Sequence, residues 1–332
     1  MFLSWKIVRL TLKETFSISY GTYSHRDALI ITLSHSGLYG YGECTAIDYY
    51  HINLSEFENK LHQVKSQIEN VKITHPALFF SFIDLLGLHS FLKSALDCAF
   101  WDLFGKLEDK NFFEINNIQI NTLPKSSLTI SVAPVANQIK KIESFNWDNF
   151  KVKCNHFDES EIRKLASLKK NISLDANGSF SKQQCNWLEN QDFVRNFTYI
   201  EQPTKTGFDN FSGLNGSLCA TWMADEDIQE NTDLSLLRHH YKAINIKLVK
   251  CGGLTPALRL LSKAKEQGFL TMIGCMTEST IGISAGAVLA PLVDFADLDG
   301  ANLIANDIAQ GSSVINGKII LSELAGLGIK II

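Results

Sequence analysis

Hydrophobic and polar residues follow two different patterns along this 332-residue chain. Near the N-terminus, short apolar segments separated by turn residues predict β-strands, with His35-Ser-Gly37 as a hairpin turn. From about 54 to 106, apolar residues recur every three or four positions, as in helices packed in a core. We therefore expect an α+β unit over residues 1–122, to which the C-terminal residues, about 315–332, return. The predicted strands of this unit are 5–9, 28–33 and 38–43.

After Pro124, short apolar segments recur roughly every 20–26 residues, with helix-like stretches such as 159–170 and 255–267 between them. Strands that alternate with helices predict a parallel sheet. Eight such strands over 123–314 favour a closed barrel. The rival is an open doubly wound sheet, but the chain has no Gly-x-Gly-x-x-Gly turn to support it. The predicted strands are 128–132, 150–154, 172–175, 198–201, 221–224, 243–248, 270–274 and 294–298.

Three carboxylates stand at the ends of three successive predicted strands. Asp175, Glu201 and Asp225 are spaced by one strand–helix unit each, so neighbouring strands would present them side by side at one mouth of the barrel. Clustered carboxylates repel one another unless a cation joins them. A purely oxygen ligand set without histidine favours Mg²⁺ over zinc. One such acid alone could be a helix cap or a surface residue, but three in this register predict a metal site.

Two lysines stand at the ends of predicted strands on opposite sides of the barrel. Lys153 ends the second strand and Lys247 the sixth, so the two would face each other across the metal. A lysine that acts as a base must be partly neutral, and we expect neighbouring cations, such as Lys250, to lower the pKa of Lys247. Bases on opposite faces of a carbon next to a carboxylate predict proton removal from one side and return on the other. The result is inversion of that carbon.

Composition excludes several other classes. The chain is 45% hydrophobic and 20% charged, with a formal net charge of −4 and a pI near 6.1, so nothing indicates a nucleic-acid or anionic-membrane surface. Its seven cysteines are scattered without a Cys-x-x-Cys pair, which favours reduced thiols over disulfides or zinc. No apolar run approaches the roughly 20 residues of a transmembrane helix, and the start of the chain lacks a signal-peptide pattern. We expect a cytoplasmic enzyme, and its assembly into a homo-oligomer stays open at this stage.

The strand-end motifs together resemble those of the enolase superfamily, in its muconate-lactonising subgroup, over essentially the whole chain. The matching segments are Gly42-Glu43, the helix at 94–106, Lys-Val-Lys, Asp-Ala-Asn, Ile-Glu-Gln-Pro, Met-Ala-Asp-Glu and Ile-Asn-Ile-Lys-Leu-Val-Lys-Cys-Gly-Gly. The resemblance implies a modified (β/α)7β TIM-like barrel with an N-terminal α+β capping domain. It also implies one Mg²⁺ per subunit on Asp175, Glu201 and Asp225, and an acid/base pair of Lys153 and Lys247.

The resemblance further assigns contacts with the substrate. Lys151 would contact the substrate carboxylate. Asp297-Leu298-Asp299 places two carboxylates on one face of the last strand, where they could hold an ammonium group. This pair of acids resembles the pair that binds the free amine of the substrate in the dipeptide epimerases. The alternative is that the two acids only cap a helix or form a loop turn. In the same family, Thr129 and Cys275-Met276-Thr277 would line the dipeptide.

The second residue of the dipeptide is a separate question. Family members that act on Ala-Glu carry an arginine where this chain has Gly21, and residues 16–23 contain no cation. A carboxylate without a partner is costly to bury, which favours Ala-X with a small or hydrophobic X, such as Ala-Ala. Arg26 could still reach the site and keeps an L-Ala-D/L-Glu epimerase open.

Other functions also remain open at this stage. An o-succinylbenzoate synthase or N-acylamino-acid racemase would use the same lysines and metal. A non-catalytic binding barrel is the alternative outside enzymes. One departure from the family motif is Asp227, which follows Ala-Asp-Glu where serine is common.

Overall fold

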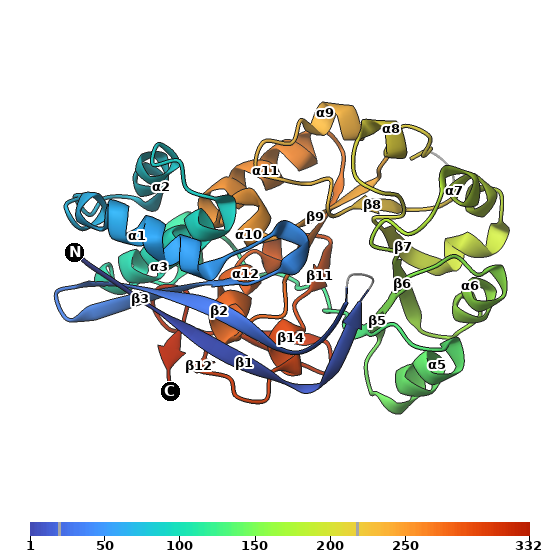
Figure 1. Cartoon of the computed structure of the whole chain (residues 1–332), viewed down its shortest axis with the longest axis horizontal. Helices are drawn as coiled ribbons and strands as arrows, with labels where there is room; N and C mark the ends of the chain where they lie inside the picture. The colour runs from blue at the N-terminus through green and yellow to red at the C-terminus, as the bar shows by residue number, and fades with distance from the viewer. Residues whose placement is uncertain (19–20, 217–218) are drawn as a thin grey trace.

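The computed structural model describes residues 1–18, 21–216 and 219–332. Its N-terminal part is a three-stranded antiparallel sheet covered by helices (Figure 1). The helical stretch expected at 54–106 consists of three separate helices, followed by a short fourth. These elements are β1 (Phe2–Ile18), β2 (Gly21–His35), β3 (Leu38–Thr45), the 3-10 turn η1 (Asp48–Tyr50), α1 (Leu54–Glu69), α2 (Pro76–Asp84), α3 (Ser90–Leu107) and α4 (Phe112–Asn116).

The first strand is much longer than the predicted 5–9. Its polar second half stays extended because it continues to pair with β2, across an irregularity between Thr11 and Phe16. Strand pairing of this kind depends on a distant partner rather than on the local pattern. Helix α3 is buried along nearly all of its length. Strand β3 lies so close to α3 that a Cβ atom at Gly42 would sit 1.9 Å from the carbonyl oxygen of Ala95.

The second part is an eight-stranded parallel sheet whose strands follow one another in chain order. Hydrogen bonds from Ser127 N to the carbonyl oxygen of Ala296 (3.0 Å) and from Leu298 N to Ser126 Oγ (2.8 Å) join its first and last strands. This arrangement is the predicted TIM-like barrel. Its strands are β4 (Leu128–Ile130), β5 (Asn149–Lys153), β6 (Asn171–Asp175), β7 (Phe197–Glu201), β8 (Trp222–Ala224), β9 (Ala243–Ile246), β10 (Leu270–Gly274) and β11 (Phe295–Asp297).

Helices of uneven length connect the strands and cover the outside of the barrel (Figure 1). In the described residues, the connections from β7 to β8 and from β8 to β9 carry only single-turn helices. The helices are α5 (Val135–Ser144), α6 (Glu159–Ala166), α7 (Lys182–Glu189), α8 (Phe208–Phe211), α9 (Leu234–Leu237), α10 (Leu248–Cys251), α11 (Leu254–Glu266) and α12 (Thr280–Ala287). The 3-10 turns are η2 (Asp192–Asn196), η3 (Ala290–Leu292) and η4 (Gly300–Leu303), and the C-terminal strands are β12 (Ala309–Gln310), β13 (Ser313–Ile315), β14 (Lys318–Ile320) and β15 (Lys330–Ile331).

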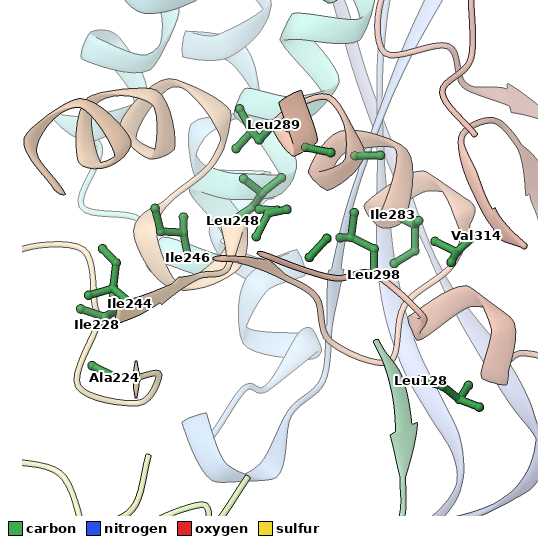
Figure 2. Packing of buried hydrophobic residues seen from close by; sticks show 14 of the residues in the cluster. Leu128, Ala224, Ile228, Ile244, Ile246, Leu248, Ile283, Leu289, Leu298 and Val314 are labelled. Atoms are coloured by element: carbon green, nitrogen blue, oxygen red, sulfur yellow. The ribbon is translucent and has the colours of Figure 1, made fainter. Parts of the chain in front are cut away.

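Along the barrel strands, hydrophobic side chains that face the core alternate with polar side chains that face the inside of the barrel. Figure 2 shows Ile244 and Ile246 of β9 in the cluster of buried hydrophobic residues. Asn245, between them, instead donates a hydrogen bond of 2.6 Å to Glu201 on β7. In β5, Phe150 and Val152 likewise belong to the hydrophobic core. The lysines that alternate with them therefore point into the barrel.

Buried polar contacts fix the N-terminal unit on the barrel. Asp97 of α3 accepts hydrogen bonds of 2.8 Å from both the backbone N and the Oγ1 of Thr255 on α11. Glu43, at the end of β3, accepts hydrogen bonds from Ser279 at the start of α12. The C-terminal segment also returns to α3, because Leu327 N donates to Asp102 at 2.9 Å. Among the described residues, no helix has the length and apolar character needed to cross a bilayer.

Candidate active site

A cavity at the carboxyl ends of the barrel strands collects most of the predicted site residues. It lies where parallel barrels place their functional groups. The barrel contributes Thr129, Lys151, Lys153, Asn177, Asp225, Glu226, Lys247, Cys275, Met276, Thr277, Asp297, Asp299, Gly300 and Leu303, and the N-terminal unit contributes Phe16, Arg26, Ile47, Tyr49 and Tyr50.

The three predicted metal ligands lie on neighbouring strands. Asp175 and Glu201 are the last residues of β6 and β7, in register with each other, and Asp225 follows β8 directly. All three are buried, with at most 2% of each residue exposed. Parallel strands with a common end thus bring together three acids that are far apart in sequence.

Lysines lie between and beside these carboxylates. Lys151 Nζ is 3.6 Å from Asp175 Oδ2 and 3.3 Å from Glu201 Oε2. Lys153 Nζ donates a hydrogen bond of 2.5 Å to Asp175 Oδ2. In the described ranges, no group of three acidic, histidine or cysteine side chains is arranged so that it could hold a metal ion. The acids are therefore held as ion pairs in this structure.

The environment of Glu201 differs from that of the other two acids. Burial, together with the neighbouring acids Asp175 and Asp225, raises the pKa of Glu201 to about 8 against the lowering effect of Lys151. Its Oε2 atom is buried and accepts no hydrogen bond within the described chain, although Lys151 Nζ lies close to it. An oxygen that lacks a partner, between two more carboxylates, fits a hard divalent cation such as Mg²⁺.

The two outer acids are tightly paired with lysines. For Asp175, burial opposes ionisation, but Lys153 and Lys151 outweigh it and lower the pKa. Asp225 contacts Lys247 (2.8 Å) through one oxygen and the fully buried Lys250 (2.5 Å) through the other. Burial opposes ionisation of Asp225, but these two lysines outweigh it and hold the pKa far below the usual range. Lys250 is therefore part of the site, which its position three residues after Lys247 could have indicated.

The two predicted bases project into one cavity from β5 and from the end of β9. These strands are four positions apart in the eight-stranded order, with the three acidic strand ends between them. The expected lowering of the Lys247 pKa is wrong for this structure. Burial does lower it, but Asp225, Glu201 and Glu226 outweigh burial and raise the pKa above its ordinary value. Lys247 is accordingly an ammonium group.

Asp297 is the last residue of β11, and Asp299 follows it by two residues; Lys151 joins Asp297 to the carboxylate cluster. Asp297 accepts a hydrogen bond from Lys151, and its Oδ1 atom is buried without a hydrogen-bond partner in the described chain. Asp299 accepts hydrogen bonds from Thr129 N (2.6 Å) and Thr129 Oγ1 (3.2 Å). Burial and the charge of Asp297 raise the pKa of Asp299 to about 7. Since the Asp299 side chain makes no capping bond to η4, a simple cap does not explain the pair.

Asp227, the departure from the family motif, has a local structural role. Its carboxylate accepts hydrogen bonds from Gln202 Nε2 (2.8 Å), Gly207 N (2.8 Å) and Tyr241 Oη (2.9 Å). It therefore ties the loop after β7 to the segment before β9. Sequence reasoning singled out Arg26 only as an alternative and gave no role to the cavity residues of the N-terminal unit, because their position depends on how that unit docks.

Comparisons with known proteins agree with this fold. Residues 135–332 match the family described as enolase C-terminal domain-like. An L-Ala-D/L-amino acid epimerase from Maribacter is 35% identical over 99% of both chains, and an L-Ala-D/L-Glu epimerase from Bacteroides thetaiotaomicron is 31% identical over 96% of this chain and 85% of its own. A crystal structure of an enolase family member from Agrobacterium tumefaciens, with bound sodium and L-Ala-L-Glu, superposes with a TM-score of 0.87 at 27% identity, covering 98% of this chain and 99% of its own. This chain therefore belongs to the enolase superfamily that its strand-end motifs resemble.

Proposed function

We propose that the protein is a Mg²⁺-dependent dipeptide epimerase that inverts the α-carbon of the second residue. The observation that carries the proposal is the placement of Lys153 and Lys247 on opposite strands, lining one cavity, with three buried carboxylates between them. The similar proteins named as epimerases of Ala dipeptides support the same reaction.

The carboxylates would hold the metal and, through it, the substrate carboxylate. Asp175, Glu201 and Asp225 are the residues that would bind Mg²⁺, which when bound makes the proton next to a carboxylate more acidic. Lys151, whose contacts reach Asp175, Glu201 and Asp297, adds positive charge beside that carboxylate. Fixed charges in a site closed to water stabilise the developing negative charge more strongly than water would.

The lysines would carry the proton across the α-carbon. One lysine, as a neutral amine, takes the proton from its face and becomes an ammonium group. The other, as an ammonium group, gives a proton to the opposite face, so the configuration changes while the proton count is conserved. Asp225 keeps Lys247 charged in this structure, which suits Lys247 to the role of proton donor. The reverse reaction exchanges the two roles.

The pair of acids on the last strand would hold the free amine of the dipeptide. Asp297 retains one oxygen without a hydrogen-bond partner in the described chain, and Asp299 is fixed by Thr129 on the first strand. An ammonium group between them would satisfy both acids and lower the raised pKa of Asp299. An N-acyl group cannot do this, which favours a dipeptide over the N-acylamino acid that a racemase of the same family would take.

The experiment that tests the proposal is proton exchange in D₂O. The Mg²⁺-loaded protein is incubated with a library of free and N-acetylated dipeptides, and mass spectrometry and chiral analysis follow the second α-carbon. We expect deuterium to enter with inversion at that carbon in free dipeptides. Exchange only in the N-acetylated compounds would point to the racemase, and absence of exchange in every compound would refute the proposal.

A further inference from the structure

Gln202 is a buried amide at the carboxyl end of β7, directly after the proposed metal ligand Glu201. Only 1% of the residue is exposed, and its φ of 36° lies in the left-handed region, where a residue with a side chain is kept by its surroundings. The backbone N of Gln202 donates a hydrogen bond of 2.8 Å to the carbonyl oxygen of Met223 on β8. Its carbonyl oxygen accepts one of 2.7 Å from Gly178 N, three residues after Asp175. One residue thus joins the ends of the three strands that carry the acids.

The side chain of Gln202 uses its whole hydrogen-bonding capacity. Its Oε1 atom accepts hydrogen bonds from Asp225 N (3.0 Å) and Asp227 N (3.2 Å). Its Nε2 atom donates to the carbonyl oxygen of Thr204 (2.9 Å) and to Asp227 Oδ2 (2.8 Å). An amide side chain has two donor and two acceptor positions, and all four are used here. The backbone of Asp225, the third proposed ligand, is therefore fixed from the end of β7.

Asp227 determines which way the amide of Gln202 points. A carboxylate only accepts hydrogen bonds, so the NH2 group of the amide faces Asp227, and Oε1 then faces the backbone N–H of Asp225. Gly207 N (2.8 Å) and Tyr241 Oη (2.9 Å) donate to the same carboxylate and hold it in place. The contact between Gln202 and the backbone of Asp225 therefore depends on a residue at which this chain departs from the family motif.

The position of Asp225 matters because Mg²⁺ demands near-ideal octahedral geometry, with oxygen ligands at about 2.0–2.1 Å. We propose that Gln202 is a positioning residue of the Mg²⁺ site, oriented by Asp227, and that it fixes Asp225 relative to the other two acids. None of its four side-chain bonds involves the Asp225 carboxylate, so Gln202 does not compete with the metal for those oxygens. The inference rests on the proposed function, because it presupposes that the acids bind the metal.

The Mg²⁺ affinity of variants tests the proposal. Gln202→Met removes all four side-chain bonds, and Asp227→Leu removes the acceptor that orients the amide. Calorimetry on chelator-treated protein should show that each variant raises the Kd for Mg²⁺ by about 10–100-fold. If Asp227 acts through Gln202, the double variant should bind Mg²⁺ no more weakly than Gln202→Met alone. Losses that add up in the double variant would assign the effect of Asp227→Leu to its missing charge and refute the orienting role.

A second measurement and a control separate this role from a merely structural one. Melting temperatures in chelator show how far each variant loses stability without the metal, and a lower melting temperature with an unchanged Kd would refute the proposal. The matched control is Gln138→Met. Gln138 is also buried, but its Nε2 atom donates at 3.0 Å to the carbonyl oxygen of the proposed base Lys153. We expect this variant to bind Mg²⁺ with the Kd of wild type.

The result for wild type distinguishes this inference from the proposed function. A wild-type protein that binds no Mg²⁺ would overturn the metal site itself and the inference with it. Binding in wild type that stays equally tight in both variants would overturn only the positioning role. If Gln202→Met does not fold, Asp227→Leu decides alone, because Asp227 is only half-buried.

Discussion

The recognition of the substrate amine is the feature most open to a quantitative test. Asp297 and Asp299 are 2% and 3% exposed, and Lys151 is the cation that contacts Asp297. Acetylation of the substrate amine would leave this pair of carboxylates short of one positive charge. At an effective dielectric constant of about 20, a charge pair at about 4 Å contributes about 4 kcal/mol. With part of that offset by desolvation, a net loss of about 3 kcal/mol corresponds to more than about 100-fold in kcat/KM.

The assay compares Ala-Ala with N-acetyl-Ala-Ala in three proteins. In wild type we expect the free dipeptide to be favoured by more than about 100-fold. In Asp299→Asn most of that preference should disappear, because the variant removes one of the two acids that meet the ammonium group. Asp294→Asn is the control, since Asp294 lies before β11 and accepts its hydrogen bond from Thr271 N at 2.8 Å, outside the cavity. Equal rates for free and acetylated substrate in wild type would refute this account of the amine site.

The same pair predicts a pH dependence. The pKa of Asp299 is raised to about 7, so below that pH the acid becomes protonated and loses the charge that attracts the ammonium group. The value of kcat/KM for free dipeptides should therefore fall as the pH drops below about 7, and this titration belongs to the coupled pair of acids. An acetylated substrate should not show this extra fall, and identical pH profiles for the two substrates would contradict it.

Three further predictions concern the metal, the bases and the interface between the two units. Chelation should abolish activity and Mg²⁺ should restore it, and Glu201→Gln should remove the Mg²⁺-induced rise in melting temperature; full activity in chelator would refute the metal site. Lys153→Ala and Lys247→Ala should each stop epimerisation while leaving α-proton exchange in one stereoisomer, and a single variant that interconverts both isomers would exclude two bases. Because burial raises the pKa of Asp97 from 3.8 to about 7, the folded state binds a proton more tightly than the unfolded state, so wild type loses stability as the pH rises through this window. Asp97→Asn cannot ionise, so denaturation should show its stability relative to wild type increasing by up to about 4 kcal/mol from pH 4 to pH 7, and a difference that does not vary with pH would refute the raised pKa.

The sequence by itself determined the barrel and the ends of its strands. Local alternation requires only that apolar residues face the helices, and parallel strands then bring their ends to one mouth. The predicted ends at 175 and 201 coincide with the last residues of β6 and β7. For the same reason the polar residues of Lys-Val-Lys could be placed inside the barrel, because the two apolar residues of β5 had to face the helices.

Only the tertiary structure decided the charges and the walls of the cavity. The pKa of Lys247 is raised because Asp225 contacts it from a neighbouring strand, a contact that outweighs the cations near it in sequence. Lys151 and Asp297 meet across 146 residues of chain. Arg26 reaches the cavity because β2 belongs to a sheet that docks over the barrel mouth. Local periodicity fixes the direction in which a side chain points, whereas electrostatic interactions and cavity shape depend on distances between segments that are brought together only by folding.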